Sequence, residues 1–143
     1  MIIKVKKLKP EAVLPVRGSE YAAGYDLCAC IEQPITIGPH NTQKVGTGLS
    51  IELPIGTFGA IFARSGLATK RGLRPANCVG VCDSDYRGEY IVALHNDTDT
   101  YQTIKPGDRI AQLVVMQFEE LEFTEDNLSD TERGEGGFGS TGE

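Results

Sequence analysis

The sequence contains no tryptophan, only two histidines and no long apolar run. A transmembrane helix needs roughly 20 consecutive apolar residues, so we do not expect the chain to span a membrane. The first ten residues, MIIKVKKLKP, lack the apolar block and the cleavage site of a secretory signal. We therefore expect a cytoplasmic protein, or one in the host-cell cytoplasm if the source is viral. Neither His40 nor His95 lies in a polar cluster of the sequence, which argues against nucleophilic catalysis that depends on histidine.

Basic residues are fewer than acidic ones, 14 against 20, and the net charge is −6. Residues 119–143 carry nine acidic residues and one basic residue, Arg133, so this segment has a net charge of −8 and the remainder +2. An acidic protein is a poor candidate for direct nucleic-acid binding. A solvated tail accounts for the acidic residues, but it leaves the single arginine unexplained.

The four cysteines form two pairs in the sequence, at residues 28 and 30 and at residues 78 and 82. Zinc-binding cysteines usually lie on turns, whereas each pair here lies in an apolar, alternating segment. Because no export signal is found, we expect free thiols that pack as small apolar side chains. The sequence therefore predicts no zinc site.

Glycine and proline together number 24 of 143 residues, and they recur every eight to twelve residues between short apolar runs. This spacing predicts many short strands. We expect strands at residues 2–5, 25–31, 35–37, 44–53, 58–63, 78–82, 90–95, 100–104 and 110–118. One short helix is expected at 65–71, capped by Ser65 and ended by Gly72. The predicted class is all-β, a sandwich or jelly roll of antiparallel strands, with a core over 1–123 and a flexible arm over 124–143.

Five segments place polar groups on expected loops and strand ends. They are residues 22–27 (AAGYDL), 63–68 (ARSGLA), 77–89 (NCVGVCDSDYRGE), 107–113 (GDRIAQL) and 133–142 (RGEGGFGSTG). A buried Asp26 would require a cation or hydrogen-bond donors, although an edge-strand aspartate that faces water is an alternative. Arg64, followed by Ser65 at a helix start, provides donors for a phosphate. A capped helix with Arg64 in a surface ion pair is the simpler alternative.

Asp83 directly follows an apolar run, and partial burial would make it a base. The same turn also fits a plain hairpin, but the aromatic Tyr86 within it favours binding. Gln112 has apolar neighbours and needs hydrogen-bond partners if it is buried. The glycines of 133–142 leave backbone N–H groups open to an anion, and Phe138 is suited to stack on a base, although a disordered tail fits this segment as well.

The sequence contains no Walker A pattern, no Rossmann fingerprint and no paired-histidine metal motif. Carboxylates, phosphate donors, an aromatic ring and a glycine-rich flap suit a nucleoside triphosphate bound with a divalent ion. In this order, the five segments resemble the five motifs of the trimeric deoxyuridine triphosphatase (dUTPase) family, over residues 22–142. Two positions depart from the family pattern. Ala63 stands where the family often has proline, and Glu135 adds negative charge where many members have a small residue.

The resemblance implies a jelly-roll subunit of the β-clip type in a homotrimer, with active sites shared between subunits. It implies that water and dUTP give dUMP and pyrophosphate with Mg²⁺, which limits uracil incorporation into DNA and supplies dUMP for dTTP synthesis. By resemblance, Asp83 is the base and Asp26 holds the attacking water and the hydration shell of the metal, whose main ligands are substrate phosphates. Asn77 and the backbone near it, including Gly80, read uracil, while Tyr86 packs against the deoxyribose. The phosphate contacts implied are Arg64, Ser65, Gly66 and Gln112, joined from another subunit by Arg133, Gly139, Ser140 and Thr141, with Phe138 over uracil.

Two other interpretations remain open. A dCTP deaminase of the same superfamily shares the fold and the triphosphate contacts, but it needs a base that acts at the C4 amino group. The complete flap and the segment from Asn77 to Tyr86 favour the triphosphatase. A regulator that binds a protein partner under nucleotide control is the second alternative, and such a role can coexist with the activity. The presence of Asp83 favours the enzyme.

Overall fold

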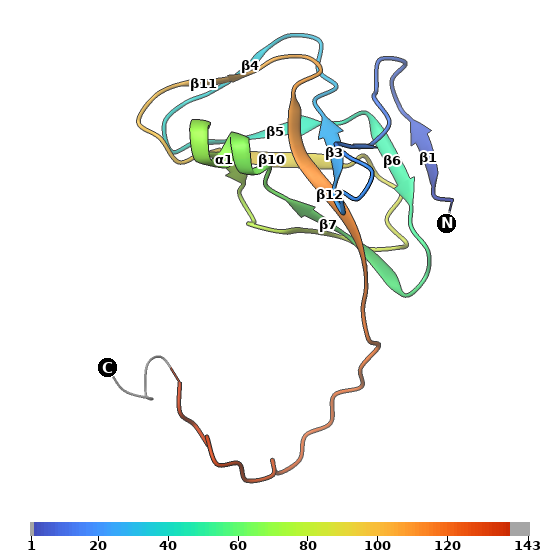
Figure 1. Ribbon diagram of the computed structural model, residues 1–143, viewed down its shortest axis with the longest axis vertical. Coiled ribbons are helices and arrows are strands. Elements are labelled where there is room, and N and C mark those ends of the chain that lie inside the picture. The colour runs from blue at the N-terminus through green and yellow to red at the C-terminus, as the bar shows by residue number, and fades with distance from the viewer. Residues whose placement is uncertain (1, 138–143) are drawn as a thin grey trace.

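Short strands make up nearly all the regular structure in residues 2–137, the part of the chain that the computed structural model describes (Figure 1). The strands are β1 (Lys4–Lys7), β2 (Val16–Arg17), β3 (Tyr25–Cys28), β4 (Ile35–Ile37), β5 (Thr42–Gly46), β6 (Leu49–Glu52), β7 (Thr57–Phe62), β8 (Leu73–Pro75), β9 (Gly80–Cys82), β10 (Ile91–Asn96), β11 (Gln102–Ile104) and β12 (Arg109–Gln117). The helix within this range is α1 (Ser65–Arg71). The predicted all-β class with one short helix is therefore confirmed.

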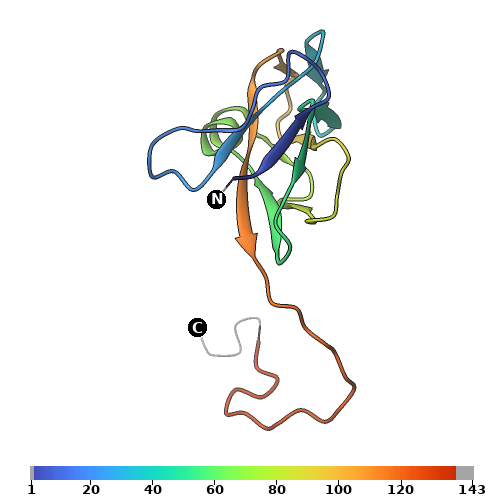
Figure 2. The ribbon, with the colours of Figure 1, turned by 90° about the vertical axis from the view of Figure 1, so that its right-hand side faces the viewer.

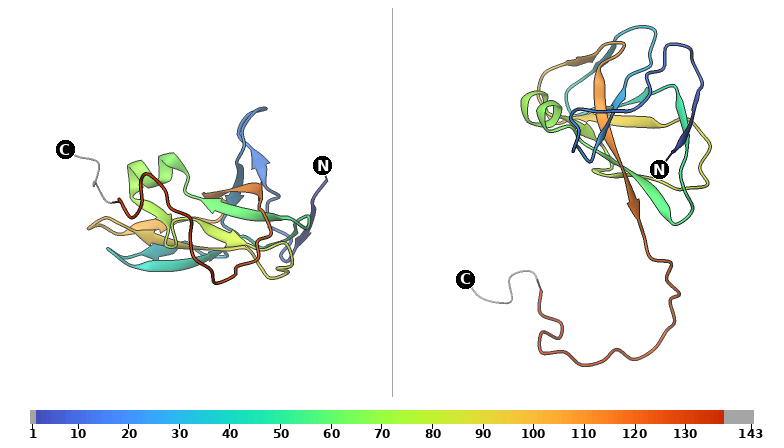
Figure 3. Two further views of the ribbon diagram at one scale, coloured as in Figure 1. Left: turned by 90° about the horizontal axis from the view of Figure 1, so that it is seen from below. Right: turned by 45° about the vertical axis from the view of Figure 1, so that its right-hand side comes forward.

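The strands form four antiparallel sheets. The largest has the order β2-β3-β12-β7-β9, the second has the order β5-β10-β8, and β1-β6 and β11-β4 are pairs. In Figure 1, β12 crosses in front of β5 and β10, and the view from below in Figure 3 shows the same elements as stacked layers. The core between the layers joins Leu27 and Leu113 of the large sheet to Val45, Val92 and Leu94 of the second sheet. The large sheet therefore has one face on the core, and its other face is available for a site.

The expected strand 44–53 is wrong, because the structure divides it into β5 and β6. Between them Gly48 has φ +67°, in the left-handed region that favours glycine. A Cβ at Gly48 would lie only 2.8 Å from Cys30 Sγ and 2.9 Å from Ala12 Cβ. The Thr47 hydroxyl donates to the carbonyl of Tyr90 at 2.7 Å and helps to hold this corner. The alternating apolar pattern continues through the corner, so the pattern alone does not reveal it.

The expected helix is confirmed at Ser65–Arg71, and Gly72 ends it with φ 61° and an N–H bond to the carbonyl of Ala68. The expected cap is wrong, because Arg64 occupies the N-cap position and makes no side-chain capping bond. Strands β2 and β8 were not predicted from the sequence. Both strands are two or three residues long, too short for an alternating pattern to be visible.

Three of the four cysteines pack as expected. Cys28 and Cys30 are buried and Cys82 is half-buried, and burial raises the pKa of the Cys28 and Cys82 thiols. The prediction is wrong for Cys78, which is exposed, lies outside β9 and has φ 62°. Within residues 2–137, no three histidine, cysteine or acidic side chains are grouped so that they could hold a metal ion. The absence of zinc stays a prediction that elemental analysis of the purified protein tests.

The chain leaves the body after β12, which ends at Gln117. Residues 118–137 contain no helix or strand, are almost entirely exposed, and extend away from the body in Figures 1 and 2. Phe118 packs edge-on against Phe58 of β7 with ring centroids 6.4 Å apart, whereas Phe123 is 90% exposed. The boundary at 123 and the flexibility of the arm stay predictions. Across the described part of the chain, no helix is long and apolar enough to cross a membrane.

Asn96, at the end of β10, connects the loop after β4 to the loop between β10 and β11 through its buried carboxamide. Its Nδ2 donates to the carbonyls of Ile37, Gly38 and Thr100 at 3.1, 3.0 and 2.7 Å, and its Oδ1 accepts from the N–H and hydroxyl of Thr98 at 3.0 and 2.7 Å. The side chain is fully buried, so its loss leaves several polar groups without partners. We expect Asn96→Ala to lower the free energy of unfolding by about 3 kcal/mol or more.

Urea unfolding followed by circular dichroism measures this change, and Asn127→Ala in the exposed arm is the control. A loss for Asn96→Ala no larger than that of the control would mean that the carboxamide bonds do not stabilise the fold. The two variants remove the same side-chain atoms, so the comparison isolates the effect of burial.

Candidate active site

Asp26 lies at the centre of a cluster of two arginines and an amide. Asp26 in β3 stands opposite Gln112 in β12, which stands opposite Phe62 in β7. Arg64 follows β7 and reaches back across the sheet, so that its Nε lies 2.7 Å from Asp26 Oδ1. Arg109 Nη1 lies 3.2 Å from Asp26 Oδ2. We call Asp26, Arg64, Arg109 and Gln112 the arginine cluster.

The cluster decides between the two interpretations of Asp26. The side chain is only 12% exposed, and β3 lies between β2 and β12 rather than at the edge of the sheet. The alternative of an edge aspartate that faces water is therefore wrong. Two guanidinium groups offset the cost of burying this carboxylate, and the carboxylate in turn orients Arg64.

Gln112 has the hydrogen-bond partner that its apolar surroundings require. Its Nε2 donates to the carbonyl of Ala63 at 2.8 Å, which fixes the turn between β7 and α1. Gly24 makes room for this carboxamide, because a Cβ at Gly24 would collide with Gln112 Oε1 and lie 3.1 Å from its Cδ. The expectation that Gln112 is hydrogen-bonded is confirmed, and Gly24 is a site residue that the sequence analysis did not single out.

The first turn of α1 faces open space beside the cluster. Ser65 and Gly66 are exposed, and apart from the chain neighbours and the backbone of α1 itself, no heavy atom of the described residues lies within 4 Å of a Cβ built at Gly66. The first N–H groups of a helix have no acceptor within the helix, and this turn contains no acidic residue. Arg64, the Ser65 hydroxyl and these N–H groups can therefore bind an anion together.

The third segment contains β9, the outer strand of the same sheet, and the turns before and after it. Gly80 in β9 stands opposite Ile61 in β7, and a Cβ at Gly80 would lie 3.2 Å from Ile61 Cβ and 3.4 Å from Asn77 Nδ2. The left-handed Cys78 turns the chain just before β9. Gly80 therefore packs its backbone directly against β7, beside the side chain of Asn77.

Asp83 and Tyr86 lie in the turn after β9. The expected partial burial of Asp83 is wrong for the single chain, because Asp83 is exposed. Tyr86 N–H donates to the carbonyl of Asp83 at 3.1 Å, and the Tyr86 hydroxyl donates to the carbonyl of Glu89 at 3.0 Å. The Tyr86 ring packs on Tyr90 with centroids 6.1 Å apart, and burial raises the pKa of the Tyr90 hydroxyl. Tyr86 is nevertheless 43% exposed, so part of an ordered aromatic side chain is open to solvent.

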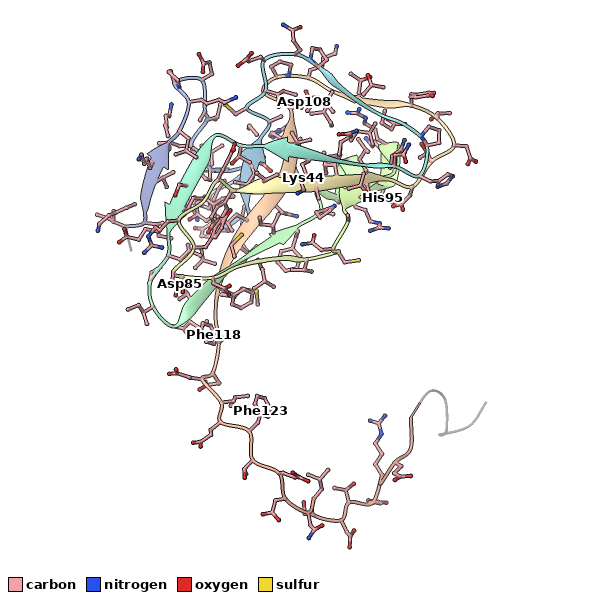
Figure 4. All side chains as sticks on the ribbon, turned by 180° about the vertical axis from the view of Figure 1, so that it is seen from behind. Lys44, Asp85, His95, Asp108, Phe118 and Phe123 are labelled. Atoms are coloured by element: carbon pink, nitrogen blue, oxygen red, sulfur yellow. The ribbon has the colours of Figure 1, made fainter. Side chains whose placement is uncertain are left out.

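The arginine cluster and the turn after β9, which holds Asp83 and Tyr86, lie apart within one chain. Gln112 stands opposite Phe62 and Cys82 opposite Gly59, three positions apart on β7 and on opposite sides of that strand. Three residues of strand span about 10 Å, and Asp83 continues away from the cluster. Figure 4 agrees, since Asp108, next to Arg109, and Asp85, next to Tyr86, lie at opposite ends of the body. One chain therefore does not bring Asp83 to Asp26.

The last segment lies on the exposed arm. Arg133 Nε donates to the carbonyl of Gly136 at 2.8 Å, and Gly134 has φ 49°. Phe138, Gly139, Ser140 and Thr141 lie outside the described residues. Arg109 lies in segment 107–113 but has no local sequence signal for a role in the site, and only its contact with Asp26 identifies it.

Comparison with known proteins agrees with this geometry. The sequence model of the dUTPase family matches residues 10–142. The deoxyuridine 5'-triphosphate nucleotidohydrolase of Candida albicans is 47% identical over 143 residues, covering 98% of this chain and 87% of that protein. The protein of the same name from Desulfitobacterium hafniense is 53% identical over 131 residues, covering 90% of this chain and 87% of that protein. The chain belongs to the dUTPase family.

Solved structures extend the likeness to the fold. A variant of the dUTPase of Staphylococcus bacteriophage 80alpha, with dUpNHpp, superposes with a TM-score of 0.85 at 28% identity, covering 99% of this chain and 98% of that one. The dUTPase of phage phi11 of S. aureus, whose structure shows a structural Mg(II) ion, gives 0.79 at 21% identity, covering 90% of this chain and 98% of that one. These likenesses agree with the predicted jelly-roll class.

Proposed function

We propose that the protein hydrolyses dUTP to dUMP and pyrophosphate, with Asp83 as the base that activates the attacking water. The observation that carries this proposal is Arg64, held by Asp26 beside the open first turn of α1, in a chain whose relatives are named for this reaction. Positioning and charge neutralisation are the main needs of phosphoryl substitution. Arg64, Ser65, Gly66 and the carboxamide of Gln112 provide both.

We assign the selectivity for deoxyuridine to the segment from Asn77 to Tyr86. Asn77 and the backbone near Gly80 form a narrow polar edge that can pair with uracil and leaves no space for the methyl group of thymine. Cytosine would present mismatched donors and acceptors, which a polar site penalises heavily. The exposed face of Tyr86 packs under the deoxyribose, where a 2′-hydroxyl finds no room.

The residues fit Mg²⁺ held mainly by the substrate. Mg²⁺ prefers phosphate oxygens and water to an all-protein cage, and residues 2–137 offer no cluster of three acidic or histidine side chains. Both oxygens of Asp26 accept from arginines but retain a lone pair each for a water of the hydration shell. When bound, the ion neutralises charge on the triphosphate.

Separation of Asp83 from the arginine cluster supports a homotrimer in which each active site is shared between subunits. The single chain exposes apolar side chains that a partner would cover, including Val81 at 63% and Ile91 at 46%. A further apolar groove of about 670 Å³ lies between β1, β6 and the end of β12. Exposed patches of this kind mark protein contacts. Analytical ultracentrifugation is expected to give three times the chain mass, and a monomer that is fully active would contradict the shared site.

Pyrophosphate release from dUTP, dCTP, dTTP and UTP, measured side by side, tests the proposed function. We expect rapid release of pyrophosphate from dUTP and little or none from the other three nucleotides. Ammonia release from dCTP would favour the deaminase instead, and nucleotide binding without any turnover would favour the regulator. A cytoplasmic location and a role in limiting uracil in DNA stay predictions that follow only if dUTP is the substrate.

Removal of Mg²⁺ is expected to lower turnover strongly without unfolding the protein, since no described residue depends on a metal for its packing. EDTA-treated protein should show the circular dichroism of the untreated protein and regain its rate of pyrophosphate release on addition of MgCl₂. Full activity after thorough chelation would remove the metal from the proposal.

Gly24→Ala is expected to lower kcat/KM for dUTP by about tenfold or more, because the new methyl group displaces the carboxamide of Gln112. Gly18→Ala is the matched control, since a Cβ at Gly18 meets no atom within 4 Å. Steady-state kinetics of the two variants measure the effect. Equal kinetics would show that the position of Gln112 is unimportant for catalysis.

A further inference from the structure

The ring of Tyr86 is held from three sides by the residues that follow it. Its hydroxyl donates to the carbonyl of Glu89 at 3.0 Å, and its ring packs on buried Tyr90. Gly88 lies against the edge of the ring, where a Cβ would be 2.5 Å from Tyr86 Cζ. The ring can therefore move only if this short loop moves.

The side chain of Glu89 ties that loop to the corner between β5 and β6. Glu89 Oε1 accepts from the N–H of Gly48 at 2.7 Å. Gly46 makes room for the carboxylate, because a Cβ there would lie 2.5 Å from Glu89 Oε1. The corner is itself rigid, since Gly48 packs closely against Cys30 and Ala12.

Further hydrogen bonds join the same loop to β6 and its corner through backbone groups of Arg87 and Tyr90. The hydroxyl of Ser50 donates to the carbonyl of Arg87 at 2.8 Å. Tyr90 N–H donates to the carbonyl of Leu49 at 2.8 Å, and Thr47 Oγ1 donates to the carbonyl of Tyr90. Tyr90 therefore links the Tyr86 ring to the corner through its own ring and backbone. Glu89 adds a second link, because its side chain contacts the corner and its carbonyl accepts from the Tyr86 hydroxyl.

We propose that Glu89 is a positioning residue that sets the choice between deoxyribose and ribose, by holding the Tyr86 ring against the corner. This inference rests on the proposed function, in which Tyr86 packs under the sugar. In this proposal the Tyr86 ring excludes a 2′-hydroxyl by steric clash, and such a clash discriminates only if the ring cannot move away from the sugar. A ring that can withdraw by about 1 Å would admit ribose, while the triphosphate contacts at Arg64 would be unchanged.

The experiment compares kcat/KM for dUTP with kcat/KM for UTP in each variant. Glu89→Ala is expected to lower this selectivity by about tenfold, and Glu89→Gln, which retains the acceptor for Gly48, to stay within about threefold of the unaltered protein. Tyr86→Phe and Gly88→Ala disturb the same contacts and are expected to lower selectivity to a similar degree. The double variant of Glu89→Ala and Tyr86→Phe should lose little more than either alone. Glu32→Ala, which removes an exposed glutamate elsewhere, is the control.

The outcomes separate this inference from the proposed function. Selectivity that is unchanged in Glu89→Ala, Tyr86→Phe and Gly88→Ala, but lost in Tyr86→Ala, would overturn the role of Glu89 and leave the proposed function intact. Unchanged selectivity in Tyr86→Ala would overturn the packing of Tyr86 on the sugar, and this inference with it. If Glu89→Ala does not fold, as judged by circular dichroism, Tyr86→Phe and Gly88→Ala decide the question.

Discussion

Asp83→Asn is expected to keep dUTP binding and to lower turnover by about 10²–10⁴-fold. An amide has nearly the shape of the carboxylate but cannot accept the proton of the attacking water. In the single chain Asp83 is exposed, directly after β9, so the substitution removes no buried contact and should leave the free energy of unfolding unchanged. Pyrophosphate release measures turnover, and equilibrium binding of dUTP to the variant measures affinity.

Asp85→Asn is the matched control, because Asp85 is an exposed carboxylate in the same turn without a proposed role. Its turnover is expected to stay within a few-fold of that of the unaltered protein. If both variants hydrolyse dUTP at nearly normal rates, Asp83 is not the base. If both lose activity equally, the turn needs negative charge rather than a base at one position.

A chain that ends at residue 132 is expected to fold with unchanged stability and to lose most of its turnover. The body ends with β12, and none of residues 118–137 belongs to the buried core, so the described part of the removed segment contributes no core contact. Ordering a segment costs about 1–2 kcal/mol per residue, whereas stacking of Phe138 on uracil offers about 1–3 kcal/mol and Arg133 on a phosphate about 1.5–3 kcal/mol. Ordering the whole flap therefore costs more than these two contacts supply, and backbone N–H bonds to the phosphates must offset the rest. Closure is expected to be weak and reversible, which permits product release.

Mixed trimers test whether the flap acts across subunits. Truncated chains mixed with full-length Asp83→Asn chains should recover part of the activity, because some shared sites combine an intact Asp83 with an intact flap. Leu128→Ala, an exposed arm position outside the motif, is the control for general damage to the arm. Trimers shown by mass to be mixed but still inactive would indicate that the flap closes on its own subunit.

The sequence by itself determined the class of the fold and the residue types of the site. Regular glycine and proline spacing with short alternating runs predicted the strands, because alternation is a local consequence of the strand period. The helix at Ser65–Arg71 was predicted because its end depends on Gly72, one left-handed residue. The resemblance of the five segments to a family was visible because each motif is contiguous along the chain and can be recognised without knowing the fold.

Only the tertiary structure decided which of these groups meet. The break at Gly48 depends on packing against Cys30 and Ala12, which are distant in sequence. The pairing of Asp26 with Arg64 and Arg109 follows from the register of β3, β12 and β7, and no local pattern encodes strand order. The same register separates Asp83 from Asp26, because β9 pairs with the far part of β7. Side-chain contacts across a sheet depend on which strands are neighbours, and that is settled only when the whole core is packed.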